Sequence, residues 1–298
     1  MDIKEIGRGV MFTYTANESP IGEYSTYLVN GDNNLYLCDS FLGPKSMEPI
    51  KDYIADQGWQ DKPMVVFLSH SDWDHVWGTC AFAGATVIAH DKCAQRMYDR
   101  GQLELERYAQ YQEGEIRLIY PSLTFENRIS FREDGMDFIY APGHTVDSAI
   151  CLNRRDSTLF VGDLVERPQP VISHHDLETY IDTLERLQGL KAETMISSHS
   201  GLVTEQDIKD NIQSIRDFQE LAQAADKDED SIEHKLYTLL MYEDAIQQTT
   251  GDSFDYISFQ KDLWKSLEKD YLSSEMALLR SVTHEDLELA LQSYMAGL

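Results

Sequence analysis

The chain has 298 residues, of which 42% are hydrophobic, so it can bury one large core, or one core with an extension, as ordinary globular proteins do. Its 52 Asp and Glu residues against 25 Lys and Arg residues give a formal net charge of −27, which repels nucleic acid and anionic membranes. No apolar stretch is long enough to span a bilayer, and the N-terminal segment lacks the basic and apolar regions of a secretory signal, so we expect a cytoplasmic protein.

Short β-strands separated by turns are predicted along the first two-thirds of the chain. A helix is predicted to begin near Ser46, and another to run from about Lys92 to Gly114, because apolar residues there recur at helical spacing. Strands followed by helices and then by further strands predict a layered α/β architecture. The segments rich in β-branched, aromatic and other apolar residues are 10–14, 24–29, 35–38, 64–68, 85–89, 116–120, 129–132, 136–140, 149–152, 158–161 and 195–197.

Beyond Thr204 the sequence predicts helices rather than strands. Thr204 and Asp207 have the spacing of a helix N-cap with an acidic residue three positions later, and Ile208 and Ile212 continue at helical spacing. Further helices are predicted at about 231–248, 258–280 and 283–295. We therefore divide the chain into an α/β domain, residues 1–204, and a C-terminal helical extension, residues 205–298.

A dense group of potential metal ligands follows the apolar strand at 64–68. The segment His70-Ser71-Asp72-Trp73-Asp74-His75 holds two imidazoles and two carboxylates within six residues. A loop at the end of a buried strand can turn several side chains toward one point, and such a ligand set suits Zn²⁺, Mn²⁺ or Fe. The alternative is a solvated polar loop, but two His and two Asp at this spacing favour a metal site.

Three further strands end in a potential metal ligand. His144 follows Pro142-Gly143 at the end of the strand at 136–140, and Asp163 follows the Gly that ends the strand at 158–161. His199 comes after the strand at 195–197. Each is an ordinary strand end by itself. Together with the first segment they indicate one binuclear site.

The order and spacing of these motifs resemble the metallo-β-lactamase superfamily. Its hallmark segment, H-x-H-x-D-H, is followed by P-G-H-T, by G-D and by a late His, and the resemblance here runs from about Met11 to Leu202. It implies an αββα sandwich, with two sheets packed face to face, helices outside and metals at one sheet edge. Residues 1–204 would then be the catalytic domain and residues 205–298 the helical extension.

The resemblance also implies the ligand set and the cofactors. Where the hallmark usually has a second His, this chain has Asp72, a harder ligand that favours Fe or Mn in at least one site over two Zn ions. The flavodiiron branch of the superfamily likewise has a carboxylate there, although it is Glu. The expected cofactors are therefore two divalent metal ions, Zn, Fe or Mn. One ion is expected on His70, Asp72 and His144, and the second on Asp74, His75 and His199, with Asp163 bridging the two.

A binuclear site of this kind predicts a metal-dependent hydrolase. A metal-bridging hydroxide would attack an ester, thioester, lactone or phosphoester of a small metabolite, and Asp74 would orient it as the catalytic residue. Two alternatives stay open: a diiron oxidoreductase related to flavodiiron proteins, suggested by Asp72, and a metal-binding sensor or effector without turnover. We expect a small-molecule substrate, no nucleic acid and no membrane, and we leave a homodimer open.

A few other residues are candidates for supporting roles. Asp39 ends a strand and is expected to support the metal site from behind. His90 is expected to cap a helix rather than to bind metal. His174 and His175 lie on a stiff loop, for which contact with substrate and a plain surface position are equally open. Trp73 is expected to form part of the pocket wall.

Overall fold

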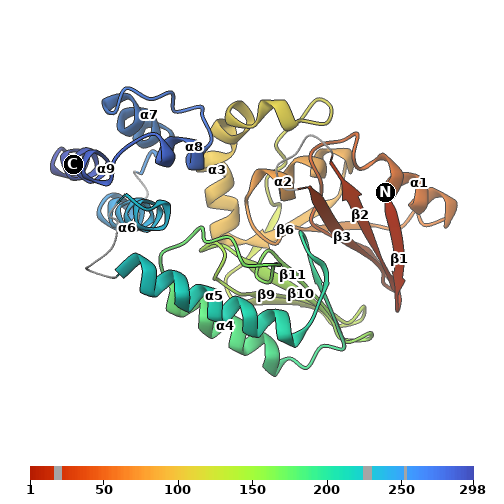
Figure 1. Cartoon of the computed structure of the whole chain (residues 1–298). Helices are drawn as coiled ribbons and strands as arrows, with labels where there is room; N and C mark the ends of the chain where they lie inside the picture. Colours follow the sequence, from red (N-terminus) through yellow and green to blue (C-terminus); the bar gives the residue numbers. More distant parts are fainter. Residues whose placement is uncertain (17–21, 224–229, 252–253) are drawn as a thin grey trace.

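Two β-sheets packed face to face lie at the centre of the computed structural model, which describes residues 1–16, 22–223, 230–251 and 254–298 (Figure 1). Within these ranges, β1 to β7 form one sheet in consecutive order, and β8 to β13 form the other. Helices cover the outer face of each sheet, and a further group of helices stands beside the sandwich. This arrangement confirms the predicted αββα sandwich with C-terminal helices. No helix of the described ranges has the length and apolar character that crossing a membrane requires.

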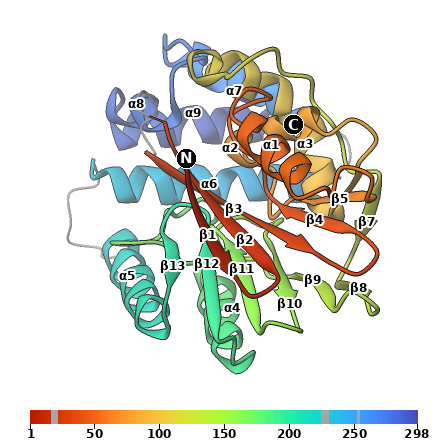
Figure 2. The same ribbon diagram turned by 90° about the vertical axis from the view of Figure 1, so that its right-hand side faces the viewer.

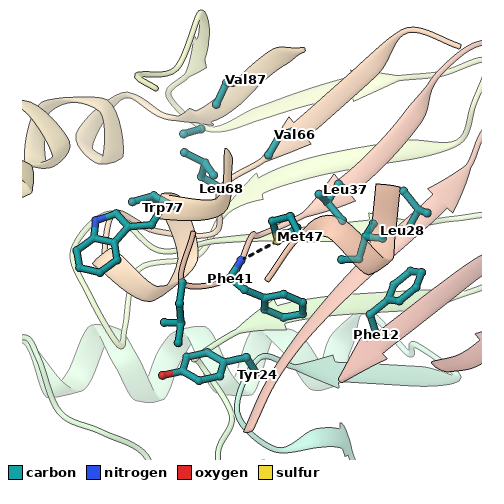
Figure 3. Packing of buried hydrophobic residues seen from close by; sticks show 14 of the residues in the cluster. Phe12, Tyr24, Leu28, Leu37, Phe41, Met47, Val66, Leu68, Trp77 and Val87 are labelled. Atoms are coloured by element: carbon teal, nitrogen blue, oxygen red, sulfur yellow. Dashed lines mark hydrogen bonds between the residues drawn. The ribbon is translucent and has the colours of Figure 1, made fainter. Parts of the chain in front are cut away.

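The first sheet is antiparallel from β1 to β4 and parallel from β4 to β7. Because side chains alternate along a strand, Val65 and Phe67 face the second sheet, while Val66 and Leu68 face the outer helices. Figure 3 shows this outer packing, in which Met47 and Trp77 lie over the sheet. The strands are β1 (Asp2–Ile6), β2 (Gly9–Thr15), β3 (Glu23–Asn30), β4 (Leu35–Cys38), β5 (Met64–Phe67), β6 (Thr86–His90) and β7 (Leu123–Phe125).

The prediction of a strand at 116–120 was wrong. Residues 115–120 are irregular, and the edge of β6 pairs instead with β7, Leu123–Phe125. Ile116, Leu118 and Tyr120 pack partly buried against the outer core of the first sheet. Their apolar pattern therefore reflects packing of a loop on the core rather than a place in the sheet.

The helices over the first sheet connect its parallel strands, since parallel neighbours need a crossover connection. The predicted helix from about Lys92 to Gly114 ends earlier, at Arg107, and a short 3-10 turn follows. His90 caps this helix, because its Nδ1 accepts a hydrogen bond from the backbone N–H of Lys92 at 3.2 Å. The elements are α1 (Glu48–Asp56), α2 (Trp73–Val76), η1 (Trp77–Ala81), α3 (Asp91–Arg107) and η2 (Ala109–Tyr111).

The second sheet is covered by α4 and α5, which lie side by side below it in Figure 1. Helix α4 was not predicted from the sequence, although Asp176 caps it and Tyr180, Leu184 and Leu187 recur at helical spacing. The Thr204–Asp207 cap of α5 is confirmed. The elements are β8 (Arg128–Phe131), β9 (Met136–Tyr140), β10 (Ala149–Asn153), β11 (Thr158–Gly162), α4 (Leu177–Gly189), β12 (Thr194–Ser197), β13 (Gly201–Val203) and α5 (Glu205–Gln223).

Four C-terminal helices form a group that we call the cap, and Figure 2 shows it behind and above the sheets. The cap has its own apolar core, to which Leu103 of α3 also contributes. One helix predicted at 258–280 is in fact two, separated by residues 267–274. The division of the chain at residue 204 stays a prediction, and the packing places α5 with the sandwich. The cap helices are α6 (Ile232–Thr250), α7 (Tyr256–Ser266), α8 (Glu275–Arg280) and α9 (His284–Ala296).

Candidate metal centre

Loops at one edge of the sandwich carry the seven predicted ligands. His70 lies three residues after the end of β5, and Asp72 is the N-cap residue of the short helix α2, whose single turn carries Asp74 and His75. His144 follows β9, Asp163 follows β11 and His199 follows β12. The structure thus brings side chains from distant parts of the sequence to one place, and their role as metal ligands stays a prediction.

One group of potential ligand atoms surrounds Asp72. Its Oδ2 lies 3.6 Å from Nε2 of His70 and 3.6 Å from Nε2 of His144. Oδ2 of Asp163 lies 3.7 and 3.8 Å from the same two nitrogens. Two imidazoles and two carboxylates therefore lie close enough together to hold one metal ion.

The second group surrounds Asp74. Its Oδ2 lies 3.7 Å from Nε2 of His75 and 3.4 Å from Nε2 of His199. Oδ2 of Asp163 lies 3.1 Å from each of these nitrogens, so this carboxylate faces both groups. Two adjacent groups of potential ligand atoms therefore share the Asp163 carboxylate.

Each of the four imidazoles is oriented by a hydrogen bond from its other nitrogen. Nδ1 of His144 donates to the carbonyl of Val171 and Nδ1 of His199 to the carbonyl of Glu23, both at 3.0 Å. A carbonyl oxygen only accepts, so Nδ1 carries the proton in both rings and the Nε2 lone pair points into the centre.

The same holds for the two imidazoles of the first segment. Nδ1 of His75 donates to Oδ2 of Asp39 at 2.8 Å. Nδ1 of His70 lies 2.9 Å from Oγ of Ser69, whose own proton goes to Asp39 Oδ2 at 2.6 Å. Asp39 therefore orients both rings, one directly and one through Ser69, which agrees with the supporting position expected for it.

Two residues beside the candidate ligands, Asp39 and Gly162, have a positive φ. Asp39 has φ of 61°, a left-handed conformation that Asp tolerates better than most residues. Gly162 has φ of 57°, and a Cβ there would lie 2.7 Å from Oγ of Ser69. A glycine is thus required before Asp163, since any side chain would displace the Ser69 hydroxyl that holds His70.

The atoms that face the centre fit a cation. Among the described residues, Nε2 of His70, Nε2 of His144 and Oδ1 of Asp163 are buried without a hydrogen-bond partner. Nε2 of His75 and Nε2 of His199 lie only 3.2 Å apart, and with both Nδ1 atoms protonated these two lone pairs repel unless a positive charge neutralises them. The donor set therefore fits one or more divalent metal ions.

The electrostatics of the centre likewise favour positive charge. Burial lowers the pKa of His144, but the Asp72 and Asp163 carboxylates outweigh it and raise this pKa to about 9. The pKa values of His75 and His199 are raised well above their usual range, because Asp163 and Asp74 outweigh the effect of burial on each. The same carboxylates that attract protons here would attract a metal cation.

Two acidic residues near the centre, Glu166 and Asp147, were not predicted from the sequence. Burial and the neighbouring Asp163 raise the pKa of Glu166 to about 7, and a carboxylate oxygen of Glu166 accepts from the backbone N–H of Val171 at 3.2 Å. Asp147 accepts from the backbone N–H of Ser71 at 2.9 Å. Glu166 stands only three residues after Asp163, which is the one sequence signal that could have marked it.

The other candidates lie outside the centre. His174 and His175 are placed beside Asp244 of α6, where Nε2 of His175 is 3.9 Å from Oδ2 of Asp244. Nε2 of His90 donates to the carbonyl of Glu126 at 2.7 Å, in keeping with a structural histidine. Trp73 stacks on Tyr108 with ring centroids 4.9 Å apart and lines a cavity beside Asp72, as expected of a wall residue.

Comparison with known proteins gives three findings. Residues 20–199 match the family described as the Metallo-beta-lactamase superfamily. A metallo-beta-lactamase from Pontibacter korlensis resembles this structure with a TM-score of 0.59 at 19% identity, over 72% of this chain and 98% of that chain. A metallo-beta-lactamase from Hirschia baltica gives a TM-score of 0.56 at 16% identity, over 72% of this chain and 97% of that one.

The third finding concerns a curated protein. A putative transcription factor of Aspergillus versicolor, avaE, is 28% identical over 149 residues, which are 43% of this chain and 41% of that protein. The chain thus matches less than half the length of this relative. The likeness to the solved structures shows the fold alone.

Proposed function

Because the chain belongs to the metallo-beta-lactamase superfamily, we propose that it is a metal-dependent hydrolase that cleaves an ester, thioester, lactone or phosphoester of a small metabolite. The observation that supports this most is the pair of ligand groups that share Asp163, with four imidazoles all turned by their Nδ1 hydrogen bonds to present Nε2. Bound divalent cations would acidify a water molecule and polarise the carbonyl or phosphoryl group.

The residues that would hold the cations follow from the two groups. Asp72 replaces an imidazole with a harder, charged oxygen, and this favours Fe or Mn over Zn in the group that contains it. The side chain of Asp72 is also the most exposed of the carboxylates, at 29%, and therefore lies on the substrate side. One cation would be held by His70, Asp72 and His144 and the other by Asp74, His75 and His199, with Asp163 facing both.

Asp74 is the proposed catalytic residue. Its side chain is buried, and one oxygen faces His75 and His199. A carboxylate in this position can orient the attacking water and pass a proton to the leaving alcohol or thiol. Trp73 and Tyr108 stack on each other and form an aromatic wall of the cavity beside Asp72.

The test compares the metal-loaded protein with variants at the centre. Reconstitution with Fe, Mn or Zn and assay against ester, thioester, lactone and phosphodiester substrates should give turnover that chelation abolishes. Asp74→Asn should lower kcat by at least about 100-fold. The matched control is Asp52→Asn on the exposed face of α1, which should leave kcat unchanged. Absence of turnover with every metal and substrate class would contradict the proposal.

A sensor or effector without turnover is the second candidate. It draws support from the relative described as a putative transcription factor, although the match covers 41% of that protein. The net charge of −27 argues against direct binding of nucleic acid by this chain. Metal-dependent turnover of a metabolite at a rate above one per second would exclude this candidate.

A further inference from the structure

A cavity of about 590 Å³ lies between residues 169–173 and helices α5, α6 and α8, and we call it the apolar chamber. Its volume falls within the roughly 300–1,000 Å³ range of small-molecule sites. Two of its wall residues keep exposed side chains, Val171 at 55% and Met276 at 39%. Apolar groups left open around such a cavity indicate a ligand site. The apolar wall consists mainly of Val171, Ile172, Phe218, Ile232, Leu236 and Met276.

The apolar chamber adjoins a smaller cavity that reaches the metal centre. This second cavity, of about 140 Å³, shares Tyr108, Ser173 and Glu275 with the chamber. Asp72 and Trp73 also line the smaller cavity, but they do not line the chamber. A molecule of moderate length that lies across both cavities therefore has one end among apolar side chains and the other beside a proposed metal ligand.

The charges around the two cavities select against an anionic group in the chamber. The charged residues in the chamber wall are carboxylates, Asp217, Glu233 and Glu275. In the smaller cavity, Nε of Arg96 lies 2.9 Å from Asp147 and is thereby neutralised.

Two more arginines line the smaller cavity, and both are also engaged by the protein. Arg100 lies 3.5 Å from Glu243, and its guanidinium stands 3.7 Å from the ring centroid of Tyr256. Arg107 donates to the carbonyl of Tyr271 at 2.6 Å. The walls therefore favour an uncharged apolar group in the chamber over a phosphate or carboxylate.

We propose that the substrate carries an uncharged, extended apolar group, an alkyl or aryl chain, which occupies the apolar chamber while the bond to be cleaved lies beside Asp72. The inference rests on the proposed hydrolase function and adds its substrate class. Water adds across the acyl–oxygen or acyl–sulfur bond, so the products are a carboxylic acid and an alcohol or thiol, and no further reactant is needed. Burial of each added methylene should raise kcat/KM about fourfold until the chamber is full.

The first experiment measures kcat/KM for p-nitrophenyl esters from acetate to octanoate in the metal-loaded protein. Met276→Trp places an indole in the chamber and should lower the ratio of kcat/KM for octanoate to that for acetate at least about tenfold. Met241→Trp is the matched control, because Met241 is 46% exposed on α6 and lines neither cavity. Circular dichroism should show the same fold for both variants.

A second measurement does not depend on catalysis. The uncharged fluorophore 1-N-phenylnaphthylamine should gain fluorescence on binding to the native protein and to Met241→Trp, and this gain should be lost in Met276→Trp. Turnover of acetate with no dependence on chain length and no dye binding would overturn the inference and leave the hydrolase function standing. Dye binding lost only in Met276→Trp, without turnover of any ester, thioester, lactone or phosphodiester with Fe, Mn or Zn, would instead overturn the hydrolase function and retain the chamber as a ligand site. Equal losses in both Trp variants would overturn the inference, since the effect would not come from the chamber.

Discussion

The sandwich and the cap position their polar groups in different ways. At the sandwich edge, polar side chains follow the ends of buried strands, and hydrogen-bond acceptors orient them. Asp39 accepts from His75, and the carbonyl of Val171 accepts from His144. In the cap, polar contacts instead join helices to one another and to α3, as when Gln260 donates to Glu243 at 3.0 Å. The first arrangement fixes the atoms of the candidate metal centre, and the second fixes how the cap helices pack. The proposed ligands therefore all come from the sandwich, whereas the wall of the apolar chamber combines α6 and α8 of the cap with residues 169–173 and α5 of the sandwich.

The largest expected effect tests whether the two cores are independent. Leu291→Ala in the cap and Leu184→Ala in the sandwich each remove a fully buried side chain, at a cost of about 2–5 kcal/mol. Hydrogen exchange should show Leu291→Ala opening α6 to α9 while the metal content of the sandwich stays constant. Leu184→Ala should lower the unfolding midpoint of the sandwich itself. Loss of metal from Leu291→Ala to the same extent would contradict the separation of the two regions.

A smaller effect is expected at the support behind the ligands. Asp39→Asn keeps a residue that tolerates a positive φ but removes the charge that accepts from His75 and Ser69. We expect metal affinity to fall about 10- to 100-fold in competition with a chelator. Asp134→Asn is the matched control, a buried carboxylate that binds Tyr36 away from the centre. If both variants bound metal equally well, Asp39 would have no part in orienting the ligands.

The smallest effect concerns pH and the surface where the cap meets α3. Burial and the nearby Asp72 raise the pKa of Glu104 from 4.5 to about 8. The folded chain therefore binds this proton more tightly than the unfolded chain, and stability falls as pH rises between these two values. In chelator-treated protein, Glu104→Gln should have a higher Tm than the native chain at pH 9 and a similar Tm at pH 4.

The control for this prediction lies on the same helix. Glu106 is exposed, and Glu106→Gln should not change the pH dependence of the Tm. A Glu104→Gln variant whose Tm difference from the native chain were constant between pH 4 and pH 9 would show that the raised pKa is not a property of the folded protein.

The sequence predicted best what is encoded locally. His70, Asp72, Asp74 and His75 follow a buried strand within a few residues, and short loops at strand ends leave a side chain few places to point. The Thr204 cap of α5 was likewise predicted, and the backbone N–H of Thr204 donates to Oδ2 of Asp207 at 2.7 Å. The geometry of a motif of three or four residues depends mainly on those residues, so it can be predicted from the sequence.

What the sequence could not predict depends on distant backbone. The acceptors of His144 and His199 are the backbone carbonyls of Val171 and Glu23. Since every residue has a backbone carbonyl, the residue type does not reveal which one accepts. The break after α7 was missed because Glu268 adopts a φ of 58° that its residue type does not favour. The apolar chamber depends on how α5, α6 and α8 pack, so its wall residues read as ordinary core positions in the sequence.

The hydrogen bond from His144 to Val171 has a consequence for how such a protein can diverge. The carbonyl of Val171 accepts from His144, a proposed metal ligand, and Val171 also lines the apolar chamber. A substitution or insertion that reshapes this loop for a new substrate would also move His144, so selection on specificity there would be constrained by selection on metal retention. Met276 reaches the same chamber from α8 without that contact. We therefore expect that substitutions which change substrate preference, in evolution or in directed evolution, occur in the cap helices while the loop that contains Val171 is conserved.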